Sequence, residues 1–312
     1  MTDYVVGIDL GATKIALGLI DPSDHITARD RLPTHTEAGP AQAVERIAAS
    51  IERLAASLPP ARRISAVGVC TPGPVDHQTG VIIDPPNLTG WRNVPFQQML
   101  AQRLGVPVVL EHDAKAAALG EFHYGVGRGT RSMVYVVAGT GVGAAIIIDG
   151  QLYRGVHNFA GEVGQMTVDR HAPAYDTSVP GAVQEYIRGP ALVREYTRLV
   201  TQNNPAAPVA ELTGEDVAIA AAAGDSLAVA VLEQAGQVLG TAIGSMALIL
   251  DIDFYVIGGS VIKSGDLLLN TARQTLPRFC LPSVAAHVRI EPAALGDDSP
   301  LLGCAYLART AS

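Results

Sequence analysis

Residues 4–21 read YVVGIDLGATKIALGLID, which is two apolar runs on either side of a short turn. The runs at 4–10 and 15–20 have the composition of β-strands, and the turn holds glycine, threonine and lysine, so the stretch predicts a β-hairpin. A similar pattern returns at residues 133–149, where MVYVVAGTGVGAAIIID passes from a strand through a glycine turn to a second strand. We interpret the two stretches as one unit used twice, an internal duplication at the scale of a domain.

The remaining segments alternate between expected helices and expected strands. Helices are expected at residues 41–57, 114–122 and about 227–250, and strands at residues 64–70, 106–110 and 254–257. A loop rich in proline and asparagine is expected at residues 200–212, and Thr213–Asp216 has the spacing of a capping box that begins a helix. This alternation indicates an α/β fold, in which ligands bind at glycine loops after strand ends.

The composition favours a folded protein that does not bind nucleic acid. The chain has 312 residues, of which 48% are hydrophobic and 17% charged, enough for two domains with sizeable cores. Its net charge is −8 at pH 7, whereas a protein that binds nucleic-acid phosphates presents a basic surface. An anionic ligand would be held by backbone N–H groups, a metal ion or a few placed cations.

The cysteines, the first residues and the most apolar late stretch bear on where the protein resides. Cys70, Cys280 and Cys304 form no CxxC pair, so neither a disulfide framework nor a cysteine zinc cluster is expected. The first residues read as a strand rather than a signal peptide. The apolar stretch at 238–250 has 13 residues, too few to cross a bilayer. We therefore expect a cytoplasmic protein with no membrane partner.

The turn of the first hairpin has the residue types that bind phosphate. Gly11 leaves backbone N–H groups accessible, Thr13 adds a hydroxyl and Lys14 adds a positive charge. Asp9, near the end of the first strand, is placed to hold Mg²⁺ through water. The alternative is an ordinary glycine turn that closes a hairpin.

Two further glycine turns follow strands in the second half of the chain. They contain Gly139, Thr140, Gly141 and Gly143 in one case, and Gly258 and Gly259 in the other. A cleft between duplicated halves would clamp a triphosphate from both sides, and the backbone at 258–259 would pass close to a nucleoside. Taken alone, each is also compatible with an ordinary turn.

Asp113 lies between the expected strand at 106–110 and the alanine-rich stretch at 114–122. A carboxylate there is either the N-cap of a helix or a group that points into a cleft. Phosphoryl transfer to an alcohol uses such a carboxylate to orient the hydroxyl and take its proton, and the positive end of the helix would keep it ionised. Farther along, Glu162 and Gln165 lie among glycines and suit the binding of sugar hydroxyls, with a polar loop as the alternative.

Taken in order, these motifs resemble the ROK family of bacterial sugar kinases, and its glucokinases most of all. The matching segments are Asp9–Lys14, Thr71–Asp76, Pro86–Trp91, Asp113–Glu121, Gly139–Gly143, Ala160–Gly164, Gly189–Leu192 and Ile257–Val261, which span nearly the whole chain. The resemblance implies an α/β fold of two actin/hexokinase-like (ribonuclease H-like) domains with an interdomain cleft. The smaller domain is expected at residues 1–112 with about 296–312, and the larger at residues 113–295.

The resemblance also implies an activity. A homodimer would use ATP and Mg²⁺ to phosphorylate a small sugar, typically at the 6-hydroxyl of a hexose, with Asp113 as the catalytic base. The phosphates would be held by Asp9, Gly11, Thr13, Lys14 and the turn at 139–143, the nucleoside by Gly258 and Gly259, and the sugar by Gly73, Asn87 and Glu162.

Three positions depart from the glucose-phosphorylating members of that family. His112 stands where they have asparagine, Gln165 where they have histidine, and Gln184 where they have a glutamate that touches the sugar. Residues 171–184 contain no cysteine where those kinases carry a cysteine-rich zinc element, so no structural zinc is expected. Because these changes remove negative charge and rearrange donors around the sugar, we expect a modified hexose, for example an aminohexose, rather than plain glucose.

Four alternatives stay open at this stage. The first two concern the substrate, which would be glucose or a C7-cyclitol. In the third, the chain would be a sugar-sensing regulator; the net charge of −8 and the strand that begins near Tyr4 both argue against it. In the fourth, the chain would be a non-catalytic sugar-binding protein; Asp9, Lys14 and Asp113 argue against it. Whether polyphosphate replaces ATP as the donor also stays open.

Overall fold

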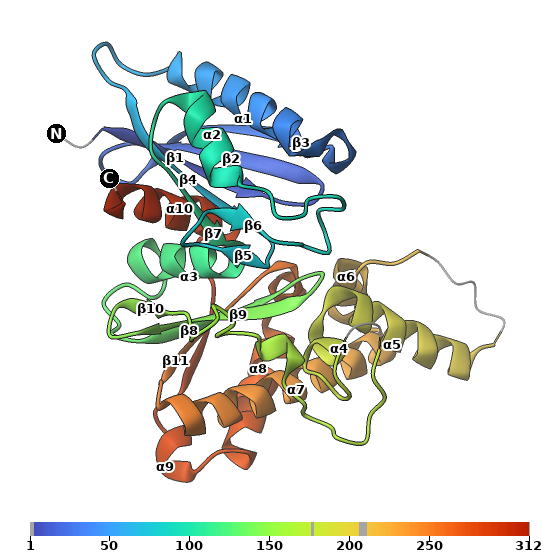
Figure 1. Ribbon diagram of the computed structural model, residues 1–312. Coiled ribbons are helices and arrows are strands. Elements are labelled where there is room, and N and C mark those ends of the chain that lie inside the picture. The colour runs from blue at the N-terminus through green and yellow to red at the C-terminus, as the bar shows by residue number, and fades with distance from the viewer. Residues whose placement is uncertain (1–2, 176–177, 206–210, 312) are drawn as a thin grey trace. The chain divides into compact units, whose positions relative to one another are not determined.

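The computed structural model describes residues 3–175, 178–205 and 211–311. The chain divides into two units (Figure 1), one made of Met1–Arg128 with Leu295–Ser312 and the other of Gly129–Ala294. Each unit has a mixed five-stranded sheet with helices packed against it, so the predicted α/β class is confirmed.

In the first unit the strand order is β3-β2-β1-β4-β7. The strands are β1 (Tyr4–Leu10), β2 (Lys14–Ile20), β3 (Ile26–Pro33), β4 (Ile64–Thr71) and β7 (Val108–His112), with a separate short pair, β5 (Val75–Asp76) and β6 (Val81–Ile82). β1 and β2 form the predicted antiparallel hairpin, whereas β1, β4 and β7 are parallel. Since parallel strands end at the same edge of a sheet, Asp9, Thr71 and His112 lie at one edge.

Four helices cover this sheet: α1 (Gly39–Ala55), α2 (Phe96–Leu104), α3 (Asp113–Tyr124) and α10 (Ser299–Thr310). Side chains alternate between the two faces of a strand. Val6 is therefore buried in the cluster that includes α1 and α2, and Val5 in the cluster that includes α10. Gly7 lets α10 approach the sheet, because a Cβ there would lie 2.0 Å from the carbonyl oxygen of Leu301.

The packing of α3 on α10 places the boundary between the units after Arg128, whereas the sequence analysis placed it after His112. The two helices meet backbone to backbone, since a Cβ on Gly303 would lie 1.7 Å from the carbonyl oxygen of Ala116. Contacts of this kind join segments that are far apart in the sequence, and a reading of local spacing misses them.

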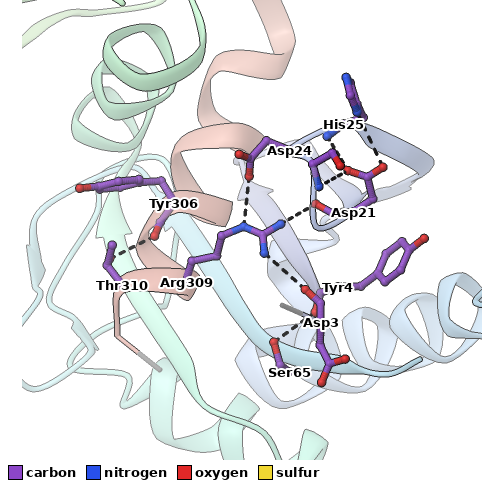
Figure 2. A network of polar contacts seen from close by, with 10 residues as sticks. Asp3, Tyr4, Asp21, Asp24, His25, Ser65, Tyr306, Arg309 and Thr310 are labelled. Atoms are coloured by element: carbon purple, nitrogen blue, oxygen red, sulfur yellow. Dashed lines mark hydrogen bonds and ion pairs between the residues drawn. The ribbon is translucent and has the colours of Figure 1, made fainter. Parts of the chain in front are cut away.

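Arg309 ties the last helix to the start of the sheet (Figure 2). Its guanidinium donates to the backbone carbonyl oxygen of Asp3 at 3.3 Å and to that of Asp21 at 2.6 Å. It also lies 3.2 Å from the Asp24 carboxylate. α10 is therefore held by hydrogen bonds as well as by apolar packing.

The second sheet has the order β10-β9-β8-β11-β12. Its strands are β8 (Met133–Ala138), β9 (Val142–Ile148), β10 (Gln151–Tyr153), β11 (Phe254–Gly258) and β12 (Arg289–Pro292). β8 and β9 form the second predicted hairpin, and β8, β11 and β12 run parallel. Counted along the chain within each unit, the strand order and directions match those of the first sheet, which confirms the internal duplication.

The helices of the second unit are α4 (Gln184–Ile187), α5 (Gly189–Asn203), α6 (Gly214–Ala222), α7 (Ser226–Leu250), α8 (Asp266–Thr275) and α9 (Pro282–Ala285). α7 is long and apolar enough to cross a membrane, but 56% of its apolar 18-residue window is buried within the unit, as in a core helix. Its glycines allow close packing: a Cβ on Gly240 would lie 2.5 Å from the carbonyl oxygen of Ala272 in α8.

The loop predicted at residues 200–212 begins later than expected. α5 continues to Asn203, because polar residues are tolerated in its last turn and the first proline comes only at Pro205. Residues 206–210 lie outside the described part of the chain. The predicted capping box is confirmed, since Thr213 N–H donates to Asp216 Oδ2 at 2.7 Å and Asp216 N–H donates to Thr213 Oγ1 at 3.2 Å.

Candidate active site

Asp9 lies in β1 opposite Cys70 of β4, near the edge where the parallel strands end. The Cys70 thiol is 3.7 Å from Asp9 Oδ1 and acts as its donor, because a hydrogen bond with Cys304 and burial raise the pKa of Cys70. Burial and the negative charge of Asp113 raise the pKa of Asp9 to about 6, and Lys14 opposes them. The structure thus gathers Asp9, Lys14 and Asp113 into one electrostatic group.

This group fits a bound cation. Two carboxylates that repel one another at a partly desolvated position are stabilised when a positive ion joins them. Among the described residues, no group of three or more His, Cys, Asp and Glu side chains could hold a metal ion. Mg²⁺ commonly keeps several waters and binds through one or two carboxylates and substrate phosphates, a mode that Asp9 would fit.

Hydrogen bonds from Gly11 and Thr34 fix the backbone of the turn in the first hairpin. Gly11 N–H donates to the carbonyl oxygen of Lys14 at 3.0 Å, and the buried Thr34 hydroxyl donates to the carbonyl oxygen of Gly11 at 2.7 Å. Thr34 N–H also donates to the carbonyl oxygen of Thr13 at 3.0 Å. These bonds fix the carbonyl groups of the turn while the Thr13 side chain stays exposed, so a phosphate can approach it.

Asp113 is the first residue of α3, and His112 rather than Asp113 is the N-cap. His112 Nδ1 accepts a hydrogen bond from Ala114 N–H at 3.3 Å and lies 3.1 Å from Asp113 Oδ1. Asp113 Oδ1 accepts from the same N–H at 2.6 Å, and 41% of its side chain is exposed. The carboxylate is therefore held by the helix N-terminus and remains accessible, a combination that suits a base.

Gly73 and Asn87 have different surroundings. Gly73 lies against the His112 ring, so that a Cβ there would come within 2.5 Å of Cδ2. Asn87 lies on an exposed turn, which is anchored by the buried side chains of Leu88 and Trp91. The structure therefore brings Gly73 together with His112, whereas the predicted sugar role of Asn87 has only the sequence motif in its support.

In the second unit, the two predicted nucleotide turns come together. A Cβ on Gly259 would lie 2.2 Å from the carbonyl oxygen of Ala138, and one on Gly139 would lie 3.6 Å from Ser260 Oγ. Gly258 packs equally closely on Tyr135, with a Cβ 2.1 Å from its hydroxyl oxygen. In the turn itself, Thr140 and Gly141 are exposed, while Gly143 is paired with Val137 inside β9.

Gly189 and Gly214, which the sequence analysis did not assign to the site, pack next to the turn at Gly139; we call these three glycines and their backbone the glycine cradle. Gly189 N–H donates to the carbonyl oxygen of Gly139 at 2.8 Å, which joins the first residue of α5 to the glycine turn. A Cβ on Gly214 would lie 2.8 Å from Gly189 Cα. Gly189 had a signal in its family motif, whereas the capping box around Gly214 indicated only a helix start.

Glu162 is exposed on a segment that packs tightly on β9. A Cβ on Gly161 would lie 2.0 Å from the carbonyl oxygen of Ala144, and one on Gly164 would lie 2.2 Å from that of Val142. The glycines on both sides of Glu162 thus let the backbone lie against the sheet, and the carboxylate stays available to a ligand.

Gln165 and Gln184 are both half-buried and both hydrogen-bonded to one short segment. Gln165 Oε1 accepts from Val179 N–H at 3.1 Å, and Gln184 Nε2 donates to Ser178 Oγ. Of residues 171–184, where the family resemblance implied the position of a zinc element, residues 176 and 177 lie outside the described part of the chain. The predicted sugar residues Glu162, Gln165 and Gln184 therefore lie in the second unit, and Gly73, His112 and Asp113 in the first.

The family model and three similar proteins all match nearly the whole chain. The ROK family model matches residues 5–311. The chain is 31% identical over 315 residues to the glucokinase of Halalkalibacterium halodurans, covering 98% of this chain and 95% of that protein. A solved ROK family glucokinase from Streptomyces griseus, in complex with glucose and AMPPNP, is 30% identical with a TM-score of 0.82, over 98% of this chain and 99% of that one.

The ROK hexokinase from Thermus thermophilus is also 30% identical, with a TM-score of 0.85 over 99% of this chain and 98% of that one. Both structural matches extend over both units, so the similarity is not confined to one glycine turn or one sheet. The chain therefore belongs to the ROK family.

Proposed function

We propose that this protein is an ATP-dependent kinase that phosphorylates the 6-hydroxyl of a hexose-like sugar. The observation that carries the proposal is the accessible carboxylate of Asp113 at the start of α3, close enough to Asp9 to raise its pKa. Phosphoryl transfer uses one carboxylate to orient the alcohol and take its proton, and places a metal ion on the phosphates. The similarity to a glucokinase and a hexokinase supports the same reaction.

The remaining residues take roles that follow from their chemistry. Lys14 and Thr13, with the backbone at Gly11, receive phosphate oxygens in the first unit. The turn at 139–143, with Gly258 and Gly259, accommodates the nucleotide in the second unit. Side chains in place of these glycines would block the access of the nucleotide to the backbone. Asp9 would hold Mg²⁺ through water, and the ion would neutralise charge on the phosphates.

The preferred substrate in this proposal is a modified hexose, for example an aminohexose. His112 beside Asp113, and the neutral amides of Gln165 and Gln184, alter the donors and acceptors that face the sugar. Glu162 remains as an anionic partner for an amine or a hydroxyl. Glucose is the second candidate, favoured by the 31% identity to a glucokinase, and a C7-cyclitol is the third.

An ADP-release assay tests the substrate. Purified protein with Mg-ATP is given hexoses, aminohexoses and C7-cyclitols, and the position of the phosphate in each product is determined by NMR. An aminohexose is expected to have the highest kcat/KM. Glucose turnover far above every other sugar would identify a glucokinase instead. A parallel series with polyphosphate in place of ATP tests the donor.

Replacement of Asp113 tests the base. Asp113→Asn is expected to lower kcat by roughly a thousandfold, within the range for loss of a general base, while the Kd for sugar changes little. Asp266→Asn is the matched control, because Asp266 is also an exposed first residue of a helix, α8. Sugar-dependent turnover that survives in Asp113→Asn would remove Asp113 from this role. Sugar binding without turnover in the unmodified protein would identify a non-catalytic binding protein or regulator.

We also propose a cytoplasmic homodimer without structural zinc. Leu248, Ile249, Phe279 and Leu281 are exposed hydrophobic side chains, of which Ile249 is 78% exposed. The end of α7 and the segment after α8 are adjacent, since a Cβ on Gly244 would lie 3.0 Å from the carbonyl oxygen of Phe279. Light scattering measures the mass, and elemental analysis of the purified protein measures zinc. A monomer, or one zinc per chain, would contradict the corresponding part.

A further inference from the structure

Two glutamine side chains are held by neighbouring residues of one segment, but through opposite ends of their amides. Gln165 uses its oxygen, which accepts from Val179 N–H at 3.1 Å. Gln184 uses its nitrogen, which donates to Ser178 Oγ. Each amide therefore keeps its other end for a different partner.

The orientation of Gln184 follows from a buried chain of hydrogen bonds. Glu185 has 1% of its side chain exposed and lies 2.8 Å from Arg188 Nη2 and 2.9 Å from Arg194 Nη1, so it is a charged carboxylate that can only accept. Ser178 Oγ lies 2.6 Å from Glu185 Oε1 and must give that carboxylate its single proton. Toward Gln184 the Ser178 oxygen can then only accept, which requires the NH₂ of Gln184 to face it. The Gln184 carbonyl oxygen is left as an acceptor.

The orientation of Gln165 is opposite. A backbone N–H can only donate, so Val179 requires the carbonyl oxygen of Gln165, and the Gln165 NH₂ is left as a donor. The segments that carry the two glutamines run side by side, because Thr167 and Ala182 form a β-bridge and Val183 N–H donates to the Met166 carbonyl at 2.8 Å.

We propose that Ser178 and Glu185 are positioning residues, which set Gln184 as an acceptor beside Gln165 as a donor so that the pair reads one sugar substituent. This inference rests on the proposed function and adds the chemistry of the group that is selected. A hydroxyl both donates and accepts, and so satisfies the pair. An amine or N-acyl N–H satisfies Gln184. A fluorine or an ether oxygen at the same carbon leaves the Gln184 oxygen without a donor, which a buried site discriminates against.

Ser178→Ala tests the inference most directly. The measurement is the ratio of kcat/KM for the best sugar of the panel to kcat/KM for each of its monodeoxyfluoro analogues. In the unmodified protein one analogue is expected to be disfavoured by about tenfold or more, the size of one lost hydrogen bond. In Ser178→Ala this ratio should fall toward 1, because the Gln184 amide is free to turn. KM for ATP should stay the same.

Two variants separate positioning from a general effect on folding. Ser178→Thr keeps the hydroxyl and should restore the ratio. Ser245→Ala removes another half-buried hydroxyl of the same unit, one that donates to the Thr241 carbonyl at 3.1 Å, and should leave the ratio unchanged. If Ser178→Ala keeps the ratio of the unmodified protein, the inference is wrong.

Glu185→Gln tests the direction of the hydrogen bonds that run from Gln184 through Ser178 to residue 185. The NH₂ of the new glutamine would donate to Ser178 Oγ, and the Ser178 hydroxyl would then donate to the Gln184 oxygen. The Gln184 amide would present its NH₂ to the ligand instead of its oxygen. The fluoro analogue should then be tolerated better than in the unmodified protein. An unchanged preference in a folded Glu185→Gln variant would contradict the inference. Loss of the two buried ion pairs could prevent folding of this variant, in which case the Ser178 series decides.

Failure of the proposed function gives a different result. If no sugar of the panel is phosphorylated, that function is wrong, and the inference is tested by calorimetry with the same sugars and fluoro analogues. The ratio of their Kd values should again depend on the Ser178 hydroxyl. If phosphorylation occurs and neither ratio depends on Ser178, the inference alone is wrong.

Discussion

The imidazole ring of His112 occupies the space that a side chain on Gly73 would fill. A Cβ on Gly73 would lie 2.5 Å from His112 Cδ2 and 2.8 Å from Nε2. Because His112 caps α3 and lies 3.1 Å from Asp113, the loop that carries Gly73 and the proposed base are coupled through one ring.

Gly73→Ala is therefore expected to lower kcat/KM for sugar by roughly 10- to 100-fold, because a displaced ring shifts Asp113 by a fraction of an ångström to an ångström. Steady-state kinetics with the best sugar measures the effect. The control is a double-mutant cycle: His112→Asn makes room for the methyl group, so Gly73→Ala should cost much less in that background. Equal costs in both backgrounds would show that the contact does not transmit the effect.

The raised pKa of Asp9 predicts a pH-dependent stability without ligands. Its pKa rises from 3.8 to about 6, so the folded protein keeps this proton longer than the unfolded chain. The wild-type protein consequently loses stability as the pH rises from about 4 to about 6. Asp9→Asn has no such loss and should be more stable than wild type by about 1–3 kcal/mol at pH 7, with a gap that closes near pH 4.

Urea unfolding of both proteins between pH 4 and pH 8 measures that gap. Asp225→Asn gives a control of opposite sign, because hydrogen bonds from the Tyr196 hydroxyl and from the first turn of α7 lower the pKa of Asp225. Its replacement should cost stability at pH 7 and cost less as the pH falls through the Asp225 pKa. If the difference in free energy of unfolding between Asp9→Asn and wild type did not change with pH, folding would not raise the pKa of Asp9.

Gly303→Ala is expected to destabilise the first unit by several kcal/mol. A Cβ there would lie 1.7 Å from the carbonyl oxygen of Ala116 in α3, and the contact is with backbone, which cannot turn aside. Thermal unfolding followed by circular dichroism measures the loss. Gly141→Ala is the matched control, since nothing lies within 4 Å of a Cβ there, and its midpoint should stay within a few degrees of wild type.

Gly214→Ala should weaken the binding of ATP more than that of sugar. The added methyl group would lie 2.8 Å from Gly189 Cα and push α6 from α5, and Gly189 is hydrogen-bonded to the turn at Gly139. We expect KM for ATP to rise about tenfold with KM for sugar nearly unchanged. Initial rates with each substrate varied in turn measure the two constants. A rise in KM for sugar alone would place the glycine cradle outside the nucleotide site.

Local patterns were sufficient for both hairpins and for several of the strands and helices that follow them. Both hairpins, the strand at 64–70 and the capping box at Thr213 follow from residue types within a few positions of one another. The start of the loop predicted at residues 200–212 was placed too early, because polar residues in the last turn of a helix resemble a loop until a proline appears. Of the two alternatives for Asp113, the N-cap is wrong, because the structure places His112 at that position.

The sequence by itself determined the α/β class, the duplication, the glycine turns and the residue types at the candidate site. It could do so because strand length, glycine content and charge are properties of neighbouring residues. Only the tertiary structure decided which unit holds α3, why Gly214 touches the turn at Gly139 through Gly189, and which end of the Gln184 amide is free. Those depend on backbone contacts and buried hydrogen bonds between distant segments, which local spacing does not record.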